Sequence, residues 1–344
     1  MSEISKENIV ESLYKIMCSG TSTMADSRVE NNDYFKRRVM GFKAEVAFED
    51  LVKQYPSVTF LEGGQFISKR LSGVSEDRNL FLYTTVSSDD PDLYKEVYET
   101  VSSWDEVGDL FFIKIKNNDW GEEAFKTRVE RGSEIKDDEI LKPKYTFFLY
   151  DKKSRTFKKH PIQDFGCILN HFNGHTRTPN LYHLRKREQF EYFKNYDIDV
   201  LKKIYGNRYF LDVILRQAQG RQIIDLDGFL KTNVKLIMVE IKEKSPIKND
   251  EGDQETWQYG WDSRRILWYL YLFKKVGLNI LYNVRQIRNR NDREFVQWDS
   301  ISIDDFLKGT SWSSSRGGGG GEDTLLAPYT FFTRLENMLE SISK

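Results

Sequence analysis

The chain has few cysteines and no excess of charge of either sign. Only Cys18 and Cys167 occur among 344 residues, so a disulfide framework and a four-cysteine zinc site are both excluded. Lysine and arginine total 52 against 53 aspartates and glutamates, which excludes a histone-like polycation. A local basic groove is still allowed, because net charge hides local asymmetry.

Long hydrophobic runs are missing as well. The N-terminal stretch MSEISKENIVESLYKIM is charged and lacks the apolar core of a signal peptide. The longest apolar run, residues 266–273, is far too short to span a membrane. We therefore expect a cytoplasmic protein without a membrane partner.

Material for a folded core is plentiful. Hydrophobic residues make up 39% and aromatic residues 14% of the chain, while 22 glycines and 7 prolines are too few for a collagen-like or disordered protein. The length suits one large or two ordinary domains.

Hydrophobic periodicity predicts an α/β (α+β) fold with a mixed central sheet flanked by helices. A helix is expected over residues 36–54, followed by a strand that Gly63 and Gly64 interrupt. Regular patterns return after residue 205, with strands at 221–230 and 234–242, a helix at 264–276 and a further strand. We divide the chain into N-terminal helices and first core elements (1–70), a large mixed insertion (71–205), a core of hairpin, helix and strand (206–310), and a glycine-rich linker with a C-terminal helix (311–344).

The stretch RQIIDLDGFLKTNVKLIMVEIK carries the most informative residues. Alternation along a strand places Glu240 and Lys242 on one face, and Asp225 and Asp227 on one face of the preceding strand. A tight turn that pairs Lys231 with Val234 would set Asp225 opposite Glu240 and Asp227 opposite Met238. Acids and a lysine in such an apolar hairpin are costly unless they are paired or bind a metal.

Hard oxygen ligands of this kind suit Mg²⁺, which usually takes one or two carboxylates and completes its shell with water and phosphate oxygens. Such an ion would polarise a phosphodiester and lower the pKa of a bound water. Lys242 could orient or deprotonate that water. Its position, two residues after Glu240, keeps it on the same face of the strand.

The pattern D-x(12)-E-x-K across an apolar hairpin, followed by a helix and a strand, resembles the PD-(D/E)xK nuclease superfamily, which includes most type II restriction endonucleases. The resemblance covers roughly residues 36–70 and 206–290. It implies that Asp227 and Glu240 hold Mg²⁺ and that Lys242 assists the attacking water. Asp225 remains the alternative first acid, although D-G-F-L is more like the family pattern. The resemblance also implies a supporting role for Glu45 on the helix before the first strand.

Arginines near these elements are candidates for contacts with DNA. Arg264 and Arg265 begin the helix after the hairpin and could reach phosphates. Arg285, Arg288 and Arg290 lie in RQIRNRNDR, where Arg, Asn and Gln are residue types that read base edges in the major groove.

The sequence as a whole suggests a Mg²⁺-dependent hydrolase, a site-specific type II endonuclease that cuts double-stranded DNA. A symmetric recognition site would favour a homodimer. Two alternatives stay open: a repair or recombination nuclease of the same fold that reads DNA structure, and a DNA- or protein-binding protein without catalysis.

Overall fold

The structure is a computed structural model, and it describes residues 4–18, 32–68, 81–128, 134, 136–161, 182–183, 187–215, 223–249, 256–289, 292–310, 314–316 and 323–343. The described residues form helices and several mixed sheets, so the expected mixed α/β class is confirmed. The chain divides into two compact units. Unit 1 contains residues 1–39 and 64–225, and unit 2 contains residues 40–63 and 226–344.

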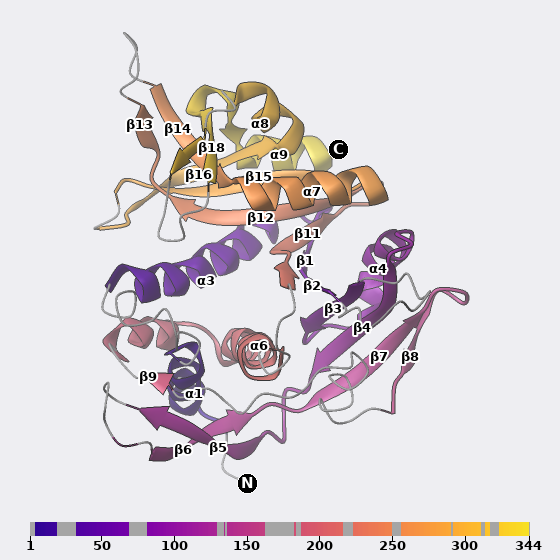
Figure 1. Ribbon diagram of the computed structural model, residues 1–344, viewed down its shortest axis with the longest axis vertical. Coiled ribbons are helices and arrows are strands. Elements are labelled where there is room, and N and C mark those ends of the chain that lie inside the picture. Colours follow the sequence, from indigo (N-terminus) through magenta and orange to yellow (C-terminus); the bar gives the residue numbers. More distant parts are fainter. Residues whose placement is uncertain are drawn as a thin grey trace. The chain divides into compact units, whose positions relative to one another are not determined.

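Unit 1 is built on two sheets. The larger has the strand order β10-β2-β3-β4-β7-β8 and the smaller β6-β5-β9 (Figure 1). The strands of the larger sheet are β10 (Ile223–Asp225), β2 (Gln65–Ser68), β3 (Phe81–Ser87), β4 (Val107–Ile115), β7 (Tyr145–Asp151) and β8 (Thr156–Lys159). Those of the smaller are β5 (Gly121–Arg128), β6 (Lys136–Lys142) and β9 (Tyr182–His183). β3 and β4 are largely buried strands.

Three α-helices complete the described part of unit 1: α1 (Lys6–Cys18), α4 (Lys95–Ser102) and α6 (Ile198–Tyr209). α1 buries Ile9, Leu13, Ile16 and Met17 and packs against α6 and β6. Its Lys15 Nζ lies 2.7 Å from Asp138 Oδ1, and Leu141 N donates to Ser12 Oγ over 3.0 Å. These contacts place the N-terminal helix with the region predicted as an insertion, so the units differ from the predicted division at residue 70.

The main sheet of unit 2 has the order β1-β11-β12-β15-β16-β19. Its strands are β1 (Thr59–Glu62), β11 (Gly228–Lys231), β12 (Leu236–Lys244), β15 (Asn279–Ile287), β16 (Phe295–Ser302) and β19 (Thr333–Arg334). β1, β11 and β12 are antiparallel neighbours, whereas β12 and β15 are parallel. A parallel pair needs a crossover, and α7 (Ser263–Val276) lies within it.

Each face of this sheet is covered by different helices. α3 (Asn32–Val52) packs Ala44, Phe48 and Val52 in one cluster with the side chains of Ile237, Val239 and Ile241 on β12. α7 lies on the opposite face (Figure 1). Because strand side chains alternate, Met238, Glu240 and Lys242 point towards the face of α7.

Unit 2 has a second sheet with the order β13-β14-β18-β17, and two further helices. The elements are β13 (Ile247–Asn249), β14 (Thr256–Asp262), β17 (Ser314–Arg316), β18 (Asp323–Pro328), α8 (Ile303–Gly309) and the expected C-terminal helix α9 (Leu335–Ser343). β17 falls in the segment that was predicted to contain a glycine-rich linker. The glycine run at 317–321 lies outside the described residues, but Arg316 and Asp323 on either side of it pair in antiparallel strands.

Candidate functional site

The turn between β11 and β12 decides which acid lies beside Glu240. Thr232 N donates to Lys235 O over 2.9 Å, and Lys235 N donates to Thr232 Oγ1 over 3.0 Å. The turn therefore spans four residues, because the threonine hydroxyl closes it from within. The predicted pairing of Lys231 with Val234 is wrong: Lys231 pairs with Leu236, and Gly228 pairs with Val239.

The same register brings Asp227 to Glu240. Asp227 lies just before β11, and its Oδ2 accepts a 2.7 Å hydrogen bond from Ile241 N. A close backbone approach fixes this segment, since Gly63 N donates to Asp227 O over 3.3 Å. A Cβ atom on Gly63 would lie 1.7 Å from Leu226 O, so only glycine fits here.

Asp225, the alternative first acid, belongs to a different sheet. The predicted continuous strand 221–230 is split between Asp225 and Gly228 into β10 and β11, which belong to units 1 and 2. Asp225 pairs with Gln65 of β2, whose Nε2 donates to Asp225 Oδ1 over 3.0 Å. The expectation that Asp225 and Asp227 share one face of one strand is therefore wrong.

Glu240 and Lys242 extend from the face of β12 that the sequence predicts. Glu240 is fully buried, and Lys242 Nζ lies 2.6 Å from its Oε1 and 3.2 Å from Asp227 Oδ2. Burial by itself would raise the pKa of Glu240, but the positive charges of Lys242 and Arg265 outweigh it and hold the pKa at about 2. Burial would lower the pKa of Lys242, yet Asp227 and Glu240 outweigh it and raise that pKa.

Arg265 completes this cluster from the first turn of α7. Its Nη1 lies 2.8 Å from Glu240 Oε2, 3.0 Å from Oε1 and 3.7 Å from Asp227 Oδ1. Asp262 sets the direction of the turn as an N-cap, because its Oδ1 accepts from the backbone N of Arg264 and of Arg265.

Aromatic side chains of neighbouring elements lie close to Glu240. Tyr269, one helical turn after Arg265, donates its hydroxyl to Glu240 Oε2. Burial and the charge of Glu240 raise the pKa of Tyr269 well above its usual range, so the hydroxyl remains a donor. Tyr282, beside Glu240 on β15, stacks on Trp261 with ring centroids 4.4 Å apart.

Arg265 and Tyr269 join the acids without having been predicted from the sequence to do so. Their spacing of four residues on a helix that follows E-x-K is a signal in the sequence, since residues i and i+4 share one helix face. Which face turns towards β12 depends on tertiary packing, so spacing alone does not single out Arg265 over Arg264.

The acid pair fits a divalent cation that prefers oxygen. Asp227 and Glu240 both approach one cation, the Lys242 ammonium, so their oxygens already converge on a shared position. Among the described residues, no group of three or more His, Cys, Asp or Glu side chains could hold a metal ion. Two carboxylates suffice for Mg²⁺ where water and phosphate oxygens complete the shell.

Glu45 lies on a helix that covers the other face of the sheet. It is half-buried on α3, next to Ala44, and Ala44 packs against the face opposite Glu240. A supporting role for Glu45 stays a prediction.

The candidate DNA-binding arginines fall into different environments. Arg264 is exposed on the first turn of α7, and Arg288 is exposed and pairs with Glu294 over 2.8 Å. Arg285 lies on β15, with a side chain 10% exposed and 2.7 Å from Glu243. Arg293 also binds Glu243, over 2.6 Å. Arg290 lies outside the described residues.

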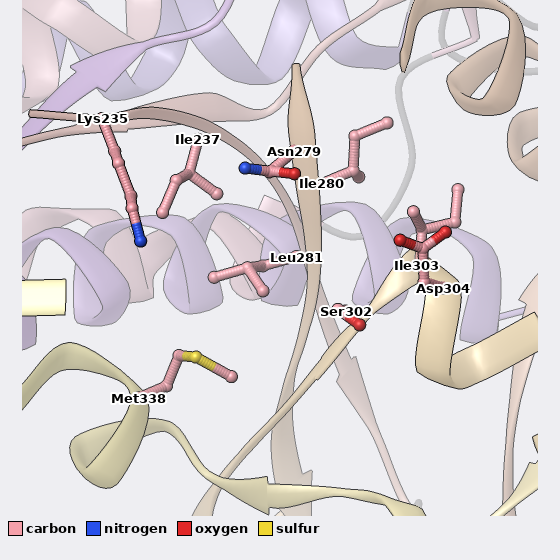
Figure 2. Close-up of a pocket in the computed structure, with 9 residues that line it drawn as sticks. All are labelled: Lys235, Ile237, Asn279, Ile280, Leu281, Ser302, Ile303, Asp304 and Met338. Carbon is pink, nitrogen blue, oxygen red and sulfur yellow. The ribbon is translucent and has the colours of Figure 1, made fainter. Parts of the chain in front are cut away.

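A pocket of about 170 Å³ lies at the other end of β12. Figure 2 shows Lys235, Ile237, Asn279, Ile280, Leu281, Ser302, Ile303, Asp304 and Met338 around it. Its walls are mostly aliphatic, and none of Asp227, Glu240 and Lys242 lines it. The charged cluster is therefore separate from this hollow.

Among the described helices, none combines the length and the apolar character needed to cross a bilayer. Neither a protein-family model, a curated protein nor a solved structure matches this chain.

Proposed function

We propose that the chain is a Mg²⁺-dependent endonuclease that hydrolyses phosphodiester bonds of double-stranded DNA. The observation that carries the proposal is the convergence of Asp227, Glu240 and Lys242, with Nζ of the lysine 3.2 Å and 2.6 Å from the two carboxylates. These are the three residues that the resemblance to PD-(D/E)xK nucleases implies. Replacing any of these three residues by an uncharged residue should therefore impair Mg²⁺-dependent cleavage of DNA.

The order of elements in unit 2 supports a nuclease core of this kind. α3 precedes three antiparallel strands, β1, β11 and β12, and α7 then leads to β15, which is parallel to β12. The resemblance implies this same order: a helix, a hairpin that carries the acids, a second helix and a further strand.

Each site residue has a separate part in the proposed reaction. Asp227 and Glu240 would hold Mg²⁺, which when bound polarises the phosphodiester and makes a bound water more acidic. In the absence of metal, the neighbouring carboxylates raise the pKa of Lys242. Its ammonium group would donate hydrogen bonds to the water or to the phosphate and stabilise developing negative charge.

Sequence-specific cutting, as by a type II restriction enzyme, is the form of this activity that we propose. Residues 71–205 are the candidate recognition part, and a homodimer would cut both strands of a symmetric site. The exposed Arg264 and Arg288 are suited to phosphate contacts. Arg285 would first have to leave Glu243, which makes it a weaker candidate for a DNA contact.

Incubation of plasmid DNA with the protein and Mg²⁺ tests the proposal. A ladder of discrete bands is expected, and it should disappear in Glu240→Ala and Lys242→Ala. Lys235→Ala is the matched control, since Lys235 is an exposed lysine next to the start of the same strand and should leave cleavage unchanged.

The other outcomes separate the alternatives. Cleavage restricted to branched or damaged DNA would replace the restriction enzyme by a repair or recombination nuclease. DNA binding without any Mg²⁺-dependent cleavage would leave a binding protein whose E-x-K is accidental.

A further inference from the structure

The charges of the site balance without any metal ion. Asp227 and Glu240 carry two negative charges, and Lys242 and Arg265 carry two positive charges within 4 Å of them. A divalent ion that enters this cluster adds charge to a group that is already neutral. The two side-chain cations therefore oppose the metal as long as they stay in place.

Arg265 and Lys242 differ in how easily their cationic groups can move away from the two carboxylates. Lys242 is two residues from Glu240 on one strand, so the backbone of β12 holds the ammonium and the carboxylate together. Arg265 reaches the acids from a separate helix through a long side chain that is 35% exposed. The guanidinium can swing into solvent by rotation of side-chain bonds alone, while Tyr269 continues to donate to Glu240.

A phosphate group is the natural acceptor for the displaced guanidinium. Arginine presents a planar fork of donors that matches two oxygens of a phosphate in the same way as two oxygens of a carboxylate. Its present contact with Glu240 is made by one nitrogen, Nη1, which lies 2.8 and 3.0 Å from the two carboxylate oxygens. A DNA phosphate at the site would thus offer Arg265 an equivalent partner at the moment when the metal takes Glu240.

We propose that Arg265 is the resident counter-cation of the acid pair, and that it passes from Glu240 to a phosphate of DNA when the divalent ion binds. This inference rests on the proposed function, because it needs Asp227 and Glu240 to be the metal ligands. Its consequence is a coupling: the metal binds weakly without DNA, and DNA binds weakly without the metal. Arg265 is then a substrate-binding residue, and Arg264, its exposed neighbour, is not part of the exchange.

Direct metal binding tests the competition. Mn²⁺, which accepts similar oxygen ligands, is titrated into the protein without DNA and followed by its electron paramagnetic resonance signal. Arg265→Gln should bind Mn²⁺ at least about tenfold more tightly than the wild-type chain, because one opposing charge is gone. Arg264→Gln, an equal change one residue earlier, should bind Mn²⁺ as the wild type does.

DNA affinity measured with and without Ca²⁺ tests the transfer to phosphate. Coupling between two ligands is reciprocal, so the gain in DNA affinity that Ca²⁺ brings equals the gain in Ca²⁺ affinity that DNA brings. That gain should be smaller by about tenfold in Arg265→Gln and unchanged in Lys235→Gln, since Lys235 is exposed and lies next to the start of β12. Gel shifts with a duplex pool of mixed sequence provide the measurement.

The outcomes separate this inference from the function on which it rests. Equal Mn²⁺ affinity in Arg265→Gln and the wild type, with both binding Mn²⁺, would overturn the counter-cation role and leave the metal site intact. Absence of Mn²⁺ binding in wild type and variant alike would overturn both proposals. If Arg265→Gln does not fold, Arg265→Lys provides the test, because it keeps the charge but loses the fork of donors. Its Mn²⁺ affinity should match that of the wild type, while the gain in DNA affinity that Ca²⁺ brings should fall.

Discussion

Replacement of Glu240 by glutamine should destabilise the protein at neutral pH and should remove part of the loss of stability that acid causes in the wild type. Glu240 is fully buried, and Lys242, Arg265 and Tyr269 contact both of its oxygens. Its pKa in the folded protein is about 2, below the ordinary value of 4.5. A carboxyl whose pKa is lowered by folding stabilises the fold above its unfolded pKa and loses that contribution as pH falls towards the folded value.

The magnitude follows from the same two values. At about 1.4 kcal/mol for each pKa unit, the ionised Glu240 contributes about 3 kcal/mol at neutral pH relative to its protonated form. About 2 kcal/mol of this should be lost between pH 7 and pH 3. A loss of 3–5 kcal/mol on breaking a buried ion pair is of the same order.

Urea unfolding of the wild type and Glu240→Gln at several pH values between 7 and 3 measures the effect. The difference in unfolding free energy should be largest above pH 5 and should shrink towards pH 3. Glu294→Gln is the control, because Glu294 is 55% exposed in its pair with Arg288 and should contribute less than about 1 kcal/mol at any pH. A difference that is independent of pH would refute the charge argument for Glu240.

Three more outcomes follow from the site. Asp227→Asn should abolish Mg²⁺-dependent cleavage in plasmid assays, whereas Asp225→Asn, whose carboxylate accepts from Gln65 in the other unit, should keep most of it; the reverse order would assign the metal to Asp225. Gly63→Ala should destabilise the fold by about 3 kcal/mol and weaken Mn²⁺ binding, since the new Cβ would collide with Leu226 O. Gly41→Ala, in an open position of α3, should instead stabilise by about 0.5–1 kcal/mol in the same denaturation assay, and equal effects at both glycines would contradict the packing argument. Ca²⁺ should support DNA binding without efficient cleavage in gel shifts, binding should weaken steeply with salt, and rapid cutting in Ca²⁺ would count against a Mg²⁺ site of this geometry.

Much of unit 2 could be predicted from local sequence. The alternation in LIMVEIK predicts a buried strand with Glu240 and Lys242 on one face, and β12 has this form. The start of α7 follows from Asp262, whose side chain accepts from the backbone at the first turn, and its end follows from Gly277, which has a φ of 72°. Such features depend on neighbours in sequence, so a single chain is enough to predict them.

Register and domain membership depended on distant residues. A two-residue shift, set by the Thr232 turn, moved Asp227 into the position opposite Glu240 that counting had assigned to Asp225. The division between β10 and β11 arose because Asp225 pairs with β2 while Gly228 pairs with β1 and β12. No local pattern distinguishes these partners, since all of them are short apolar strands.

The sequence by itself determined the mixed α/β class, the strand of Glu240 and Lys242, and the ends of α7. The tertiary structure decided which arginine joins the acids. Arg264 and Arg265 are chemically identical neighbours, and a rotation of about 100° around the helix axis separates one from the other. The packing of α7 against β14, β15 and β18 turns Arg265 inward to Glu240 and leaves Arg264 exposed, because only one side of a helix can face the structure it covers.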